Sequence, residues 1–203
     1  MSGGLSGLLR RFRVGEPVVV VSGLPRSGTS MAMKMLEAGG VEVVTDGIRS
    51  ADTDNPKGYY EDERVKDLAK MDDRSWLRGA RGKAIKIISF LLKDLPEDND
   101  YKVVFMQREL SEVLASQQKM LDHREEDLET EDDAMADLYI EHLRQVKFMV
   151  GYRRHFDTLF VKYSEVLADP EPHARLVNAF LGGELDERAM VEVVDPDLYR
   201  NRA

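Results

Sequence analysis

Residues 17–44 read PVVVVSGLPRSGTSMAMKMLEAGGVEVV, and this stretch decides the fold. The run at 17–22 is continuously apolar and rich in valine, a pattern typical of a strand buried on both faces in a parallel sheet. A glycine-containing turn follows, and from Thr29 apolar residues recur at helical spacing until a Gly-Gly pair ends the helix. The apolar run resumes at 41–44. The stretch therefore predicts a strand, a loop, a helix and a second strand.

The rest of the chain alternates strand and helix patterns. Further strands are predicted at 84–88, 102–106 and 158–163, and helices at 62–70, 111–121, 135–153 and 172–181. Such alternation indicates βαβ units. We therefore predict an α/β protein with a three-layer, P-loop-like fold, in which a mainly parallel sheet of about five strands is flanked by helices. Since the composition does not change along the chain, residues 1–203 are predicted to form one domain, with 1–15 as a flexible extension.

Composition excludes several classes of function. The 203 residues contain no cysteine and four histidines without metal-binding spacing, so we expect no metal site. The net charge of -9 argues against sequence-independent binding of nucleic acid. No apolar run approaches the roughly 18 residues of a membrane span. The N-terminal basic residues follow a short apolar stretch, the reverse of a secretory signal, so we expect a cytoplasmic protein.

Residues 23–30, GLPRSGTS, have the spacing of a phosphate-binding loop. A loop that joins a buried strand to a helix presents backbone N–H groups and the positive end of the helix dipole. The position of the lysine in nucleotide triphosphatases is Thr29, and no apolar run ends in the aspartate that holds magnesium there. Arg26, Ser27, Thr29 and Ser30 instead suit a terminal phosphate or phosphosulfate held without magnesium. The alternative is a plain glycine turn capped by hydroxyls.

A second anion-binding pattern follows a later strand. The apolar run at 101–106 is followed by Arg108, and the helical stretch ELSEVLAS ends eight residues later at Ser116. An arginine at the carboxyl end of a strand and a hydroxyl in the next helix can converge on one anion. A surface arginine and an unrelated helical serine are the alternative interpretation.

With these two motifs the chain resembles the sulfotransferase superfamily. The resemblance implies 3′-phosphoadenosine 5′-phosphosulfate (PAPS) as the donor, with 3′-phosphoadenosine 5′-phosphate as the product. Its 5′-phosphosulfate would be bound by Pro25, Arg26, Ser27, Gly28, Thr29 and Ser30, and its 3′-phosphate by Arg108 and Ser116. The stretch FVKYSEVLADPEPHARLVNAFLG is similar to a late strand and helix of the family, which implies that Tyr163 lies near the donor.

The resemblance also implies catalytic residues for sulfuryl transfer to a hydroxyl or amine. Lys86 matches a family lysine two residues before a catalytic histidine, but the histidine position is Ile88 here. The acidic stretch EDERV is similar to the segment that supplies the base in tyrosylprotein sulfotransferases, so Glu61 is the first candidate for the base and Asp62 the second. Arg26 and Lys86 would supply the cations. Lys86 extending from a strand to solvent and Glu61 as a solvated acid are the alternatives.

Four further features carry expectations. Residues 74–86 are basic without an acid, which favours either an anionic ligand, such as at the mouth of the donor channel, or a solvated loop. Residues 55–61, NPKGYYE, are similar to a segment of bacterial sulfotransferase-like proteins. The aromatic residues that either line an acceptor pocket or belong to the core are Trp76, Tyr59 and Tyr60. Arg200 and Arg202, near the end of the sequence, match only poorly the basic residues of a late family loop that folds over the 3′-phosphate.

The leading hypothesis is therefore a PAPS-dependent sulfotransferase acting on a small-molecule, carbohydrate or lipid acceptor, or on a peptide tyrosine. One alternative is a P-loop kinase-like phosphotransferase for a small metabolite. Another is a non-catalytic nucleotide-binding protein of the same fold. The chain is short for the superfamily, so an open site, a homodimer that completes the site, and loss of catalysis all stay open.

Overall fold

The computed structural model describes residues 14–46, 60–124 and 132–195. The strands in this part of the chain are β1 (Val18–Gly23), β2 (Val43–Val44), β3 (Ala84–Lys86), β4 (Tyr101–Gln107) and β5 (Phe156–Lys162). The α-helices are α2 (Thr29–Ala38), α3 (Glu63–Lys66), α4 (Leu110–Arg124), α5 (Asp132–Tyr152), α6 (Tyr163–Ala168), α7 (Pro170–Leu181) and α8 (Glu187–Glu192). The 3₁₀ helices are η1 (Ser75–Ala80) and η2 (Ser89–Asp94).

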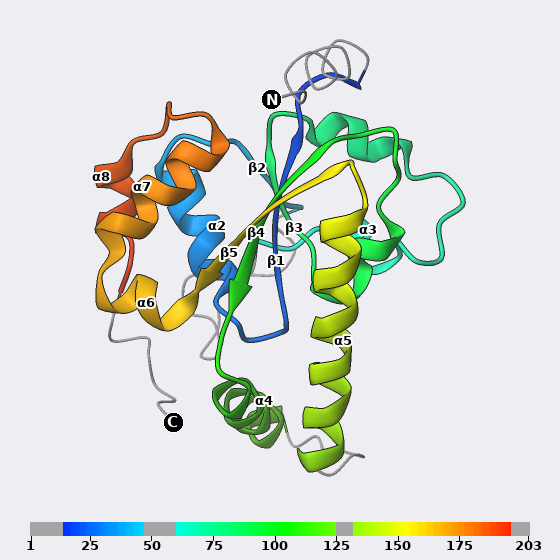
Figure 1. Ribbon diagram of the computed structural model, residues 1–203, viewed down its shortest axis with the longest axis vertical. Coiled ribbons are helices and arrows are strands. Elements are labelled where there is room, and N and C mark those ends of the chain that lie inside the picture. The colour runs from blue at the N-terminus through cyan, green and yellow to red at the C-terminus, as the bar shows by residue number, and fades with distance from the viewer. Residues whose placement is uncertain (1–13, 47–59, 125–131, 196–203) are drawn as a thin grey trace.

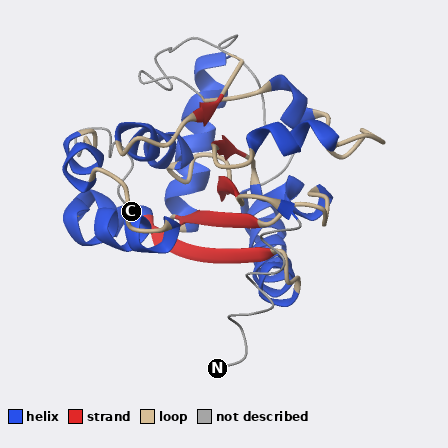
Figure 2. Cartoon of the chain, turned by 90° about the horizontal axis from the view of Figure 1, so that it is seen from above, coloured by secondary structure: helices blue, strands red, loops and turns tan. Residues whose placement is uncertain are grey.

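The strands form one sheet in the order β2-β3-β1-β4-β5, and every pairing between them is parallel. Val20 in the central strand β1 stands opposite Ile85 on one side and Val103 on the other. Figure 2 shows the strands side by side with helices around them. The predicted α/β class and the parallel sheet of about five strands are thus confirmed.

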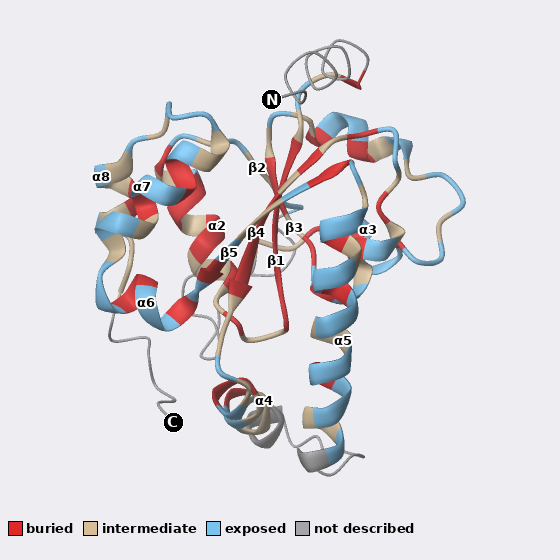
Figure 3. Cartoon of the chain, in the orientation of Figure 1, coloured by how far each residue is buried: buried red, intermediate tan, exposed pale blue. Residues whose placement is uncertain are grey.

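Helices cover both faces of the sheet, as Figure 1 shows. Val18 and Val20 pack on one face, in a cluster with residues of α5, η1 and η2. Val19 and Val21 pack on the other, in a cluster with residues of α2, α6, α7 and α8. All four valines are buried (Figure 3), which explains why β1 is apolar at every position instead of at alternate ones.

The parallel strands share one carboxyl edge, and the candidate site lies at this edge. Because the strands are parallel, Gly23, Lys86, Gln107 and Lys162 end β1, β3, β4 and β5 at this one edge. The segments that follow these residues therefore begin there. Ligands of open α/β sheets bind at this edge.

Some element boundaries differ from the prediction. The strand predicted at 84–88 ends at Lys86. The apolar run in the sequence continues past this residue, and Ile88, just before η2, is 37% exposed. Tyr163, predicted to end a strand, is instead the first residue of α6. The helix predicted at 62–70 is short and comprises Glu63–Lys66.

Candidate functional site

The loop between β1 and α2 turns at two glycines and places the helix N-terminus at the carboxyl edge. Ser27 N donates to the carbonyl of Leu24 at 3.2 Å, and Gly28, at φ 94°, is the N-cap residue of α2. Because glycine has no side chain with which to cap, the first amides of α2 are left to solvent, neighbouring groups or a ligand. Such a terminus is suited to binding a phosphate group.

Hydroxyl groups line the same loop. Ser22 Oγ and Ser27 Oγ are buried and have no hydrogen-bond partner among the described residues. A Cβ on Gly23 would lie 2.3 Å from Ser27 Oγ, so only glycine lets the loop close this tightly. Thr29 is buried and Ser30 is half-buried. A bound anion or water can accept the hydrogen bond that such a buried hydroxyl lacks, so these donors fit a phosphate group.

Tyr163 connects the loop to the end of β5. The side chain is 6% exposed and packs so closely on the loop that a Cβ at Gly28 would lie 2.3 Å from its Cδ2. The guanidinium of Arg108 lies over the Tyr163 ring, 4.8 Å from its centroid. Burial raises the pKa of the Tyr163 hydroxyl, which therefore stays protonated at neutral pH. Tyr163 thus lies between the two predicted anion-binding motifs.

The second motif also lies at the carboxyl edge, directly after β4. Arg108 Nε donates to Glu112 Oε2 at 2.8 Å, and Arg108 Nη1 donates to the backbone carbonyl of Arg26 at 3.0 Å. Ser116, 4% exposed in α4, accepts a hydrogen bond from Arg26 Nε at 3.0 Å. The structure therefore brings Arg26, Arg108 and Ser116 together, although about 90 residues separate the first from the last.

The two predicted catalytic residues Glu61 and Lys86 form an ion pair. Lys86 Nζ lies 3.3 Å from Glu61 Oε1, with the two side chains 12% and 23% exposed. The carbonyl of Glu61 accepts from Thr45 Oγ1 at 3.0 Å and from Asp46 N at 3.2 Å, which ties this backbone to the segment after β2. A carboxylate and an ammonium group are thus held together at the carboxyl edge, with part of each still open to solvent.

Asp62, the second candidate for the base, has a structural role. Its carboxylate caps α3 by accepting from Arg64 N at 3.0 Å and pairs with the Arg64 guanidinium at 2.9 and 2.6 Å. The hydrogen bonds from Arg64 hold the pKa of Asp62 below its usual range. A carboxylate that is buried and engaged on both oxygens is a poor proton acceptor, so the geometry favours Glu61.

Asp62→Asn is expected to lower the free energy of unfolding by about 1–2 kcal/mol at pH 7, because asparagine keeps the cap and loses the charge. The folded pKa of Asp62 lies below the unfolded value, so the folded state binds fewer protons. This stabilisation begins to decrease as the pH falls to about 4 and is lost completely only below the lower, folded pKa. Urea unfolding at pH 7 and pH 3 measures both effects. Asp67→Asn, in an exposed pair, is the control, and an equal loss in both variants would contradict the assignment.

The basic stretch at 74–86 does not form one patch. Arg78 pairs with Asp98 at 2.6 Å and Lys83 pairs with Glu42, both before β3 and so at the amino edge of the sheet. β3 then carries the chain across the sheet and leaves Lys86 at the carboxyl edge. Of the two interpretations of this stretch, the separation of its charges by β3 favours the solvated loop over a joint anion-binding patch.

The aromatic residues predicted for an acceptor pocket or the core divide similarly. Trp76 packs against the core cluster, with the Arg64 guanidinium 4.4 Å from its ring centroid. Tyr60 packs on the opposite face and donates to Glu37 Oε2 at 2.6 Å. The other residues that carried expectations, 55–58, Tyr59, Arg200 and Arg202, lie outside the described residues.

Sequence reasoning missed Glu112, which is 4% exposed beside Arg108. The signal was present, since an acid four residues after an arginine faces it on a helix. It also missed the contact of Arg26 with Ser116, for which a linear sequence offers no signal.

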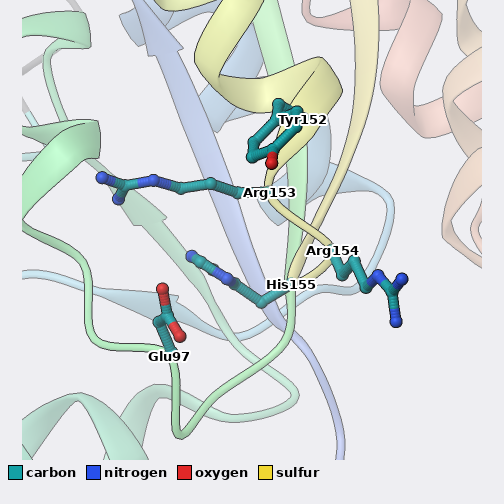
Figure 4. A pocket seen from close by; sticks show the side chains of 5 residues that line it. All are labelled: Glu97, Tyr152, Arg153, Arg154 and His155. Carbon is teal, nitrogen blue, oxygen red and sulfur yellow. The ribbon is translucent and has the colours of Figure 1, made fainter.

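A pocket of about 510 Å³ lies at the opposite, amino edge of the sheet, and its lining residues are Glu97, Tyr152, Arg153, Arg154 and His155. Figure 4 shows the His155 ring extending towards Glu97 while Arg154 points away. Arg153 and Arg154 follow the last residue of α5, where cations complement the negative end of the helix dipole. Arg153 also donates to the carbonyl of Lys93 at 3.1 Å. The positions of Arg153 and Arg154 thus have a structural explanation. The phosphate-binding loop at 23–30 lies at the opposite, carboxyl edge of the sheet.

The described residues show neither a metal-binding cluster nor a membrane-spanning helix. No group of three or more histidine, aspartate or glutamate side chains there is placed to hold a metal ion. None of the helices in the described ranges combines the length and apolarity needed to span a membrane.

Comparison with solved structures identifies the fold. The chain is similar to the sulfotransferase domain from the curacin biosynthetic pathway, with a TM-score of 0.52 and 10% identity over 89% of this chain and 78% of that chain. It also matches a sulfotransferase from Alicyclobacillus acidocaldarius, with a TM-score of 0.45 and 15% identity over 86% of this chain and 85% of that one. No protein-family model and no curated protein sequence matches the chain. The first likeness shows that the chain has the sulfotransferase fold, as the resemblance of its motifs implied.

Proposed function

We propose that this protein transfers a sulfuryl group from PAPS to a hydroxyl or amine of an acceptor molecule. The observation that carries the proposal is that five segments far apart in sequence converge at the carboxyl edge. They are the loop, Arg108 with Ser116, Tyr163, and the two segments that contribute the Glu61–Lys86 pair. The sulfotransferase fold supports the same conclusion. Localisation in the cytoplasm and one domain are part of the proposal.

The donor side of the site is built for two anionic groups. The loop amides and hydroxyls of residues 25–30 would bind the 5′-phosphosulfate, and Arg108 with Ser116 would bind the 3′-phosphate. The missing loop lysine, replaced by Thr29, argues against magnesium-ATP as the donor. When bound, PAPS supplies the sulfuryl group: its sulfur–oxygen bond to the 5′-phosphate breaks as the bond to the acceptor oxygen or nitrogen forms.

The pairing of Glu61 with Lys86 supports the chemical roles that we propose for them. Glu61 would accept the proton of the acceptor hydroxyl or amine, which makes that group a better nucleophile. Lys86 would offset the negative charge that develops on the leaving phosphate oxygen. The pairing with Glu61 keeps the ammonium group of Lys86 beside the carboxylate at the carboxyl edge of the sheet.

Arg108→Ala tests the donor site through binding of 3′-phosphoadenosine 5′-phosphate, measured by titration calorimetry. We expect the wild type to prefer this nucleotide to magnesium-ADP, and the variant to bind it about 10- to 100-fold more weakly, because a charge-assisted contact is lost. Arg78→Ala, at the amino edge, is the matched control. The double variant Arg108→Met, Glu112→Gln avoids leaving Glu112 without this ion-pair partner.

The other outcomes identify the alternatives. A preference of the wild type for magnesium-ADP would favour the kinase-like phosphotransferase and contradict the proposal. Binding of neither nucleotide would favour a scaffold that has lost its ligand.

A further inference from the structure

The outer face of α5 presents large apolar side chains to solvent. Phe148 and Tyr152, one turn apart, are 75% and 78% exposed, and their rings lie parallel within 7° with centroids 6.0 Å apart. Leu138, nearer the start of the helix, is 60% exposed. Figure 3 shows that much of α5 is exposed, although its inner face packs on the sheet. Exposed aromatic side chains that gather on one face are typical of a surface that binds another protein.

The same surface continues onto the edge of the sheet. β5 is the last strand in the sheet order, and Phe160 on this strand is 37% exposed. Lys147 Nζ, from α5, lies 6.0 Å from the centroid of the Phe160 ring, so the helix and the strand form one continuous face. Natural proteins tend to cover the outer edge of such a strand, because it can pair with other chains. We call the exposed side of α5 together with Phe160 the α5 face.

The charges of the α5 face are divided between the two halves of the helix. Asp137 and Glu141 lie in the first half of α5, and Arg144 and Lys147 lie in the second half. All four side chains are exposed. One end of the face is therefore acidic and the other basic, so the face is complementary to a second copy of itself that runs in the opposite direction. A second copy that ran in the same direction would instead bring like charges together.

We propose that two copies of this chain form a homodimer through the α5 face, with the two α5 helices antiparallel about a two-fold axis. The acidic half of each helix lies against the basic half of the other, and the exposed aromatic side chains are buried between the chains. α5 ends at the amino edge of the sheet, where β5 begins, so the carboxyl edges of the two chains lie at opposite ends of the dimer. Each candidate site is then built by one chain alone. This inference goes beyond the proposed function and does not depend on it, and it argues against a homodimer that completes the site.

Light scattering after gel filtration tests the interface. The wild type is expected to have twice the 23.1 kDa mass of one chain. For Phe148→Glu we expect the mass of one chain and a dissociation constant raised about 100-fold or more, because a carboxylate replaces an aromatic anchor in a buried interface. Leu176→Glu, which changes a 47% exposed side chain on α7, is the control and should leave the dimer intact. Thermal unfolding verifies that each variant is folded.

Reversal of the charges tests their pairing across the interface. Arg144→Glu with Lys147→Glu makes all four charges of the α5 face acidic, and Asp137→Lys with Glu141→Lys makes all four basic. Each double variant alone should have the mass of one chain, because like charges face each other. An equimolar mixture of the two should form a heterodimer. A mixture that does not combine would contradict the charge pairing.

Introduced cysteines report the direction of the two helices, because the chain has no cysteine of its own. Ala134 and Gly151, near opposite ends of α5, are both exposed, and a Cβ at Gly151 meets nothing within 4 Å. In a mixture of Ala134→Cys and Gly151→Cys, a short thiol-reactive cross-linker should join the two different variants. In parallel copies it would join each variant to itself.

Three further results would overturn the inference. A wild type with the mass of one chain at every concentration up to its solubility limit would leave the α5 face to a different partner. A dimer that survives Phe148→Glu would place the interface elsewhere, and joining of each cysteine variant to itself would contradict the antiparallel arrangement. None of these results affects the proposed transfer of a sulfuryl group, which titration with 3′-phosphoadenosine 5′-phosphate tests separately.

Discussion

Glu61→Gln is expected to lower kcat for sulfuryl transfer by about 100-fold or more, while the affinity for 3′-phosphoadenosine 5′-phosphate changes little. Glutamine has nearly the same shape as glutamate and still accepts a hydrogen bond from Lys86, 3.3 Å away, but it cannot take a proton. The loop and Arg108, which would hold the donor, belong to other segments of the chain. Release of 3′-phosphoadenosine 5′-phosphate from PAPS, followed with an acceptor found by screening, measures the effect.

Glu63→Gln is the control for this variant. Glu63 lies two residues further on, is exposed, and pairs with Lys66 at 2.6 Å, so its charge resembles that of Glu61 without the contact to Lys86. The control should keep nearly full activity. Full activity of Glu61→Gln would contradict the assignment of the base, and a similar loss in both variants would point to a general effect of the acidic segment's charge.

The parts of the fold that could be predicted from sequence are those that depend on local patterns. β1 was predicted because a strand buried on both faces has no polar positions, and α2 because its apolar residues recur at helical spacing up to Gly39. The end of β3 could not be predicted, because the apolar residues after Lys86 serve to pack a 3₁₀ helix as well as they would continue a strand.

The candidate site divides in the same way. Arg108 and Ser116 could be predicted as a pair because a strand end and the next helix bring them together over eight residues. The contact of Arg26 with Ser116 depends on how β1 and β4 lie side by side, which no spacing in the sequence records. The charges of the basic stretch at 74–86 do not form one patch for a related reason, since β3 divides them between two edges of the sheet.

Lys86→Met is expected to lower kcat by about 100- to 1,000-fold, the range seen when a group that stabilises developing charge is removed. Methionine keeps much of the length and apolar volume of a side chain that is only 12% exposed, so folding should be little affected. Lys83→Met is the control, because Lys83 is the basic residue at the other end of β3 and pairs with Glu42. Turnover of both variants under saturating donor measures the difference, and normal turnover of Lys86→Met would remove it from the reaction.

Combining Lys86→Met with Glu61→Gln separates chemistry from structure. If the pair acts as one unit in the transition state, the double variant should be scarcely slower than the slower single variant, because effects of groups that act together are not additive. If each residue acted alone, the two losses would multiply. The ion pair at 3.3 Å adds a stability test of the same cycle. Removing either charge leaves the other in a partly buried place, so the double variant should be no less stable than the singles. Multiplying losses in kcat, without coupling in stability, would mean that the pair seen in the structure is not the arrangement in which the reaction occurs.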